Sequence, residues 1–188
     1  MILIFHRTGQ RRYAIQARRP GLPELVMDPA PGYDPLMPHD LLHLVVEAQL
    51  GLDGGVFGQL ADGGDAGTFH PITAGAAPPR AGARARRRVA RRGKKLMRAG
   101  RYDSAKSERA AYIYWYEWLA RSTSPDRRMT AQAMSEAASH IRGVATSDEL
   151  RALDERVTQV CRHLDELSSR WAQLAVGESM SVRWPDLE

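Results

Sequence analysis

Two histidines and two acidic residues lie close together near the start of the segment HDLLHLVVEAQL, residues 39 to 50. His39, His43 and Glu47 are each four residues apart, and side chains at that spacing share one face of an α-helix. Two imidazole nitrogens and a carboxylate on one face can bind a divalent metal such as zinc. Asp40, next to His39, could then act as a catalytic base toward a metal-bound water. The spacing therefore predicts a metal-dependent hydrolase as one candidate function.

The segment HDLLH resembles the HExxH helix of zinc metallohydrolases, with Asp40 where that family has glutamate. The resemblance implies that His39 and His43 are zinc ligands and that Asp40 activates water. A longer stretch resembles uncharacterised bacterial proteins that carry a PHDxxHxxVE pattern. No activity comes with this second resemblance, and the matching residues are Pro38, His39, Asp40, His43, Val46 and Glu47.

A structural interpretation of the same four residues competes with the metal site. Asp40 falls in the first turn after Pro38, where a carboxylate meets unpaired N–H groups and the positive end of the helix dipole. His39 and His43 can be satisfied by loop carbonyls, and Glu47 can face water. The sequence leaves both interpretations open.

The strongest feature of the composition is a basic run between Arg80 and Arg101, RAGARARRRVARRGKKLMRAGR. It holds 11 basic and no acidic residues, whereas the segments before and after it each carry a net charge of −3. The formal net charge of +5 therefore comes from this one run. A positive field this local attracts polyanions.

On a helical projection the cations of this run gather on about half of the circumference, opposite Val89, Gly93, Leu96 and Met97. The sequence therefore predicts a basic amphipathic helix that binds phosphate groups of nucleic acid, or another polyanion, without strong sequence preference. A solvated, partly disordered linker is the alternative. The predicted nucleic-acid-binding residues are Arg84, Arg87, Arg88, Arg91, Arg92, Lys94, Lys95, Arg98 and Arg101.

The N-terminal third has the pattern of a small antiparallel sheet with one buried helix. Residues 2–5 and 13–17 read as a hairpin, and residues 24–27 read as a third strand that Asp28-Pro29 ends. Residues 39–50 form the buried helix, which Gly51 stops. The glycine-rich loop from Gly51 to Gly67 contains a short helix at 56–60 but matches neither a phosphate-binding loop nor an EF-hand.

The C-terminal half is predicted to be helical. After a helix at 104–121 and a short one at 130–142, a heptad repeat runs through residues 150–174. Its partner is either the 104–121 helix of the same chain, packed through Tyr112, Trp115 and Leu119, or a second subunit in a homodimer. Residues 180–185 alternate like a strand that returns to the N-terminal sheet.

Taken together, the patterns predict an α+β fold with three regions before the final strand at 180–185. These are a small α+β domain at 1–73, an Ala/Gly/Pro linker with the basic segment at 74–101, and a helical region at 102–179. No run of 18 apolar residues occurs, which predicts that the chain has no transmembrane segment. The single Cys161 cannot form an internal disulfide, which fits a reducing, cytoplasmic location. A purely structural or oligomerising role is the third candidate function.

Overall fold

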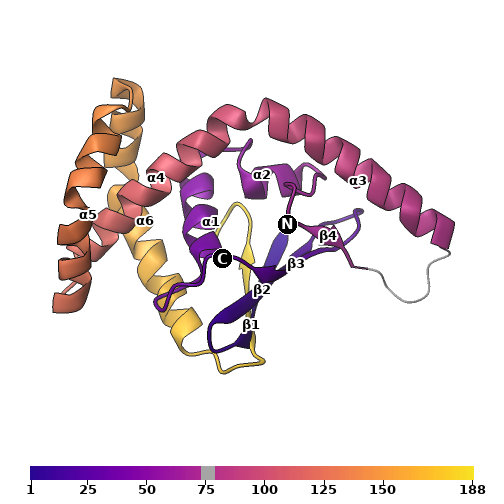
Figure 1. Ribbon diagram of the computed structural model, residues 1–188, viewed down its shortest axis with the longest axis horizontal. Coiled ribbons are helices and arrows are strands. Elements are labelled where there is room, and N and C mark those ends of the chain that lie inside the picture. Colours follow the sequence, from indigo (N-terminus) through magenta and orange to yellow (C-terminus); the bar gives the residue numbers. More distant parts are fainter. Residues whose placement is uncertain (73–78) are drawn as a thin grey trace.

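The computed structural model describes residues 1–72 and 79–188, and Figure 1 shows how the elements are arranged. The predicted α+β class is confirmed, with a small sheet followed by a helical C-terminal half. In chain order the elements are β1 (Ile2–Gly9), β2 (Arg12–Arg18), β3 (Leu25–Ala30), α1 (His39–Leu50), α2 (Val56–Ala61), β4 (His70–Pro71), α3 (Pro79–Ala99), α4 (Arg101–Ala120), α5 (Pro125–Gly143), α6 (Ser147–Ala172) and β5 (Ser179–Arg183).

The five strands form one antiparallel sheet in the order β4-β3-β2-β1-β5. The last strand lies beside the first, and Ile2 faces Arg18 on one side and Arg183 on the other. Contrary to prediction, Asp28-Pro29 does not end the third strand, which runs to Ala30. Proline is tolerated there because, among the described residues, β4 pairs only with the start of β3, at Leu25 and Val26, and no described strand pairs with the further part of β3 on that side.

Helix α1 is the centre of the packing. It spans the predicted residues, begins after Pro38 and ends at Gly51, whose φ of 62° is left-handed. Its aliphatic side chains are buried in one core that draws on the sheet and on the C-terminal helices alike. The predicted N-terminal and C-terminal regions therefore share a single hydrophobic core.

The heptad residues of α6 are buried against the same chain. Thr146 and Glu149 form the predicted capping box at its start, and α6 contacts both α4 and α1. The predicted intrachain packing on α4 is observed, and α1 is an additional partner. The buried seam consists of Leu153, Val160, Leu164, Leu167 and Trp171.

Two helix boundaries differ from the prediction because of proline. Helix α5 begins at Pro125 rather than Thr130, since proline fits the first helical turn, where its missing N–H is not needed. Helix α3 begins at Pro79, ahead of the basic run. The earlier part of the predicted linker, residues 74–78, lies outside the described residues.

Candidate functional site

Helix α3, together with Arg101 at the start of α4, presents the basic run to solvent. All nine predicted nucleic-acid-binding side chains are exposed, whereas Val89 on the opposite side is only 4% exposed. In the described part of α3, no Arg or Lys has a carboxylate partner within 4.0 Å. Elsewhere such pairs are common, as between Arg109 and Glu149 at 2.8 Å and between Arg142 and Glu117 at 3.0 Å. The described cations of α3 are therefore not neutralised by close ion pairs.

Two glycines fix α3 against the body of the protein. A Cβ atom on Gly93 would collide with the side chain of Asp65, and one on Gly100 would collide with the backbone of Gly54. Gly100 lies between α3 and α4, and Figure 1 shows that the two helices form one arch over α2. Gly93, which would weaken an isolated helix, thus permits the close packing that holds the basic face outward.

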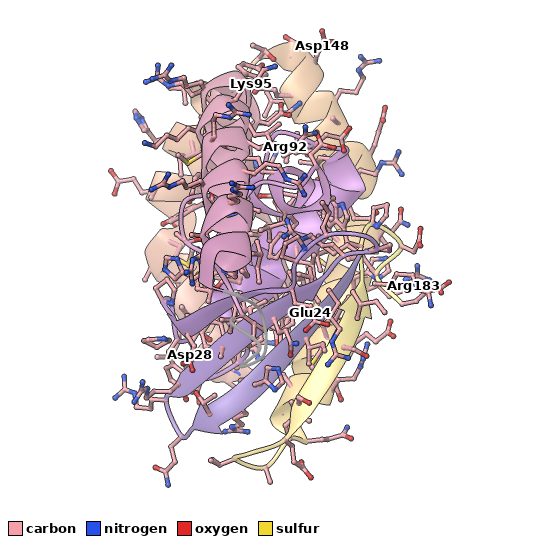
Figure 2. The ribbon with its side chains drawn as sticks, turned by 90° about the vertical axis from the view of Figure 1, so that its right-hand side faces the viewer. Glu24, Asp28, Arg92, Lys95, Asp148 and Arg183 are labelled. Carbon is pink, nitrogen blue, oxygen red and sulfur yellow. The ribbon has the colours of Figure 1, made fainter. Side chains whose placement is uncertain are left out.

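A groove runs along one flank of α3. It has a volume of about 810 Å³, and its opposite wall is formed by Leu22 and by residues 61–63 at the end of α2. Arg92 donates a hydrogen bond from Nε to the backbone carbonyl of Asp62 across the groove. Figure 2 shows Arg92 and Lys95 on this side of the helix. The cations that line the groove are Arg88, Arg91, Arg92 and Lys95.

Arg19, which the sequence analysis did not single out, holds the opposite wall in place. Its side chain is buried and donates from Nη1 to the carbonyls of Leu60 at 3.0 Å and Gly64 at 2.8 Å, and from Nη2 to that of Pro23 at 2.7 Å. Burial lowers the pKa of the guanidinium, and the charge of Asp65 opposes this effect. In the sequence, Arg19 is only the second of two arginines at the end of a strand. That position does not indicate that its side chain is buried.

The polar stripe of α1 is present, but its members have partners inside the protein. Glu47 is 1% exposed and accepts hydrogen bonds from the backbone N–H groups of Val56 at 3.0 Å and Phe57 at 2.9 Å. Its carboxylate therefore caps the start of α2. The structural interpretation had expected Glu47 to face water instead. Burial raises its pKa to about 7, although these bonds and one from Ser107 favour the charged form.

His43 belongs to the same buried network. The Ser107 hydroxyl donates to Glu47 Oε1 at 3.1 Å and is hydrogen-bonded to Nδ1 of His43 at 2.9 Å. The other ring nitrogen, Nε2, faces Glu108 Oε2 at 3.7 Å. Burial, and then the neighbouring His39, lower the pKa of His43 to about 4.

Asp40 and His39 occupy the other end of the stripe. The Tyr13 hydroxyl donates to Asp40 Oδ2, and burial raises the pKa of this carboxyl group although the bond from Tyr13 lowers it. The His39 ring stands edge-on to that of His43, with centroids 4.6 Å apart. His39 also lines a cavity between α1, α4 and α5.

The geometry lends no support to a metal centre on α1. Among residues 1–72 and 79–188, no three His, Cys, Asp or Glu side chains gather closely enough to hold a metal ion. Glu47 already uses both carboxylate oxygens, and His43 uses Nδ1. The zinc site of His39, His43 and Glu47 therefore stays a prediction from sequence.

Comparison of this chain with protein-family models, curated proteins and solved structures found no significant match. Within the described ranges, no helix is both long enough and apolar enough to cross a membrane. The basic face of α3 and the buried network of α1 are therefore interpreted from their own geometry and charge.

Proposed function

We propose that this protein binds nucleic acid, or another polyanion, through the basic face of α3 and without strong sequence preference. The observation that carries the proposal is the row of exposed Arg and Lys side chains without carboxylate partners in the described part of α3. Guanidinium groups match phosphate oxygens in geometry, and their binding releases counterions condensed on the nucleic acid.

The length of the row sets the size of the contact. Arg84 and Arg98 are 14 residues apart, which corresponds to about 21 Å along a helix. Each strand of a duplex has one phosphate per about 3.4 Å of duplex axis, so a helix lying along the axis matches roughly six phosphates of one strand. Four cations of this row line the groove beside α3, where a phosphate backbone can lie between α3 and Leu22.

A second groove on the same side extends the surface. It has a volume of about 490 Å³, shares Leu22 with the first groove and includes Arg18 and Arg183 in its lining. Figure 2 shows Arg183 on the side of the molecule that carries Arg92 and Lys95. Glu24 lies 3.4 Å from Arg18 and reduces the positive charge there. The main contact is therefore expected on α3, with the sheet edge as a weaker extension.

The chemistry of the grooves favours backbone contacts over base recognition. Among the described residues, no Phe, Tyr or Trp lines either groove, so the stacking that recognises unpaired bases is not provided by them. On α4, Trp118 donates to Asp165 Oδ1 at 2.7 Å and Tyr114 donates to the Leu153 carbonyl at 3.0 Å. These aromatic side chains serve the helix packing, which supports binding that is indifferent to base sequence.

The proposal is tested by charge removal with a matched control. A variant with serine at Arg87, Arg88, Arg91 and Arg92 loses four exposed charges of α3. The control loses the same number by serine substitution at four exposed arginines of α5 and α6, namely Arg128, Arg151, Arg156 and Arg162.

Binding to labelled single-stranded RNA and to duplex DNA is measured at low salt by fluorescence anisotropy. The α3 variant should bind at least about a hundredfold more weakly than the wild type, because phosphate contacts dominate affinity. The control should stay within a few-fold of the wild type. Equal losses in both variants would show that only net charge matters and would refute the assignment to α3.

A further inference from the structure

A second concave site, separate from the α3 grooves, lies between α1, α4 and α5. It is a cavity of about 220 Å³ with both acidic and aromatic walls. Asp34 and His39 come from the loop before α1 and its first turn, Glu108, Tyr112 and Trp115 come from α4, and Met134 comes from α5. Within the described part of the chain, no arginine or lysine lines it.

We propose that this cavity binds a small organic cation that carries a primary ammonium group. Carboxylates of Asp34 and Glu108 can accept hydrogen bonds from the ammonium group, and the aromatic rings of Tyr112 and Trp115 in the same lining can attract a cation through their π electrons. The apolar walls accommodate an aliphatic body. The same charge pattern would repel the phosphates proposed to bind α3.

Two further carboxyl groups, Asp40 and Glu47, lie close enough to Glu108 to feel its charge. Burial is the main cause that raises the pKa of both Asp40 and Glu47, and the charge of Glu108 adds to it. Asp34 and Glu108 are therefore the carboxylates that give the cavity its negative charge. His43 lies behind this wall and stays neutral at pH 7, because burial and His39 lower its pKa to about 4. It therefore does not offset the negative charge.

The nearest cations of α4 belong to a different surface. Lys106 and Arg109 line a separate cavity of α4, where Arg109 pairs with Glu149 at 2.8 Å. Their charges are therefore not part of the wall that contains Glu108. An added cation in the acidic cavity gains attraction without displacing an internal ion pair.

The size and the walls favour an organic cation over a metal ion. A volume of 220 Å³ holds about seven water molecules at roughly 30 Å³ each, which matches a short alkyl diamine. A metal ion would need three or more close His, Cys, Asp or Glu ligands, and the described residues contain no such group. Cadaverine is therefore a suitable probe, and choline is a cation of similar size without an N–H group.

The test is isothermal titration calorimetry of the full chain with cadaverine at low ionic strength. We expect saturable binding with a dissociation constant between about 10 μM and 1 mM and weaker binding of choline. Glu108→Gln should weaken cadaverine binding about fivefold, and Asp34→Asn with Glu108→Gln about tenfold or more. The asparagine side chain keeps an oxygen for the Leu36 N–H, to which Asp34 Oδ1 bonds at 2.8 Å in the wild type.

The matched control is Glu136→Gln, which removes an exposed carboxylate of α5 two residues from Met134. This variant should bind cadaverine like the wild type. Absence of saturation up to about 10 mM cadaverine, equal binding of choline, or unchanged affinity in the double variant would overturn the proposal. None of these outcomes depends on whether α3 binds nucleic acid, because the two sites share no described residue.

Discussion

Replacing Glu47 by glutamine should make the stability of this protein rise with pH, and replacing His43 by asparagine should make it fall. In the wild type, the two side chains act against each other. The pKa of Glu47 is raised from 4.5 to about 7, and the pKa of His43 is lowered from 6.5 to about 4. Both shifts have burial as their largest cause.

The signs follow from which state binds more protons. Between pH 4.5 and 7 the folded protein keeps the Glu47 proton that the unfolded chain releases, so the free energy of unfolding falls as pH rises. Between pH 4 and 6.5 the unfolded chain protonates His43 while the folded protein does not, so the free energy of unfolding rises with pH. Each shift of about 2.5 units is worth roughly 3 kcal/mol at about 1.36 kcal/mol per unit. The two contributions therefore largely cancel in the wild type.

Urea unfolding between pH 4 and pH 7 measures these slopes, provided that each protein unfolds in a two-state manner. Relative to the wild type, Glu47→Gln should gain about 3 kcal/mol of unfolding free energy from pH 4.5 to pH 7, beyond a constant loss from its weakened bond to α2. Relative to the wild type, His43→Asn should lose about 3 kcal/mol of unfolding free energy from pH 4 to pH 6.5. Because other carboxyl groups titrate alike in all three proteins, only these differences count. The difference in unfolding free energy between each variant and the wild type is plotted against pH. If both differences are flat, or change in the same direction, burial does not shift the pKa values of Glu47 and His43 in opposite directions, and the reasoning is refuted.

Three further predictions concern packing. In urea unfolding, Gly100→Ala should lower the free energy of unfolding by about 1–3 kcal/mol, because the new Cβ meets the backbone of Gly54. The control is Gly143→Ala, whose Cβ meets nothing within 4 Å, so this variant should be neutral or slightly stabilising. Arg19→Lys should cost about 2–4 kcal/mol in the same assay, since one ammonium cannot keep the three carbonyl contacts of the guanidinium. Cys161 is buried, and burial raises the pKa of its thiol to about 11. A disulfide reagent at neutral pH should therefore label Cys161 only at the rate of unfolding. Fast labelling of the folded protein would contradict this burial.

Local periodicity was sufficient to predict much of the fold. The bounds of α1 follow from Pro38 and Gly51, and the α6 seam follows from the heptad spacing. Such features depend on neighbours within a few residues, which the sequence displays directly. The face of α4 was predicted less well, because Tyr114 is fully buried whereas Tyr112 is only half-buried. Small residues such as Ala110 and Ala111 face the core on α4. The prediction placed Tyr112 on the buried face because large aromatic side chains usually pack in a core.

The candidate sites show the opposite balance. The cations of α3 could be predicted because charge and exposure go together. The partners of the α1 stripe could not, since Ser107 is 60 residues from Glu47 and reaches it only through the packing of α4 on α1. Arg19 was missed for the same reason, because nothing near it in the sequence indicates that three carbonyl groups surround it.

The most direct test of the central claim is the salt dependence of duplex DNA binding by the wild type and by the variant with serine at Arg87, Arg88, Arg91 and Arg92. With roughly six phosphate contacts, the logarithm of the wild-type binding constant should fall against the logarithm of salt concentration with a slope of about −5. Loss of four contacts should reduce the slope to about −2. Absence of binding at low salt, or the same slope for both proteins, would contradict the claim that α3 is the polyanion-binding element.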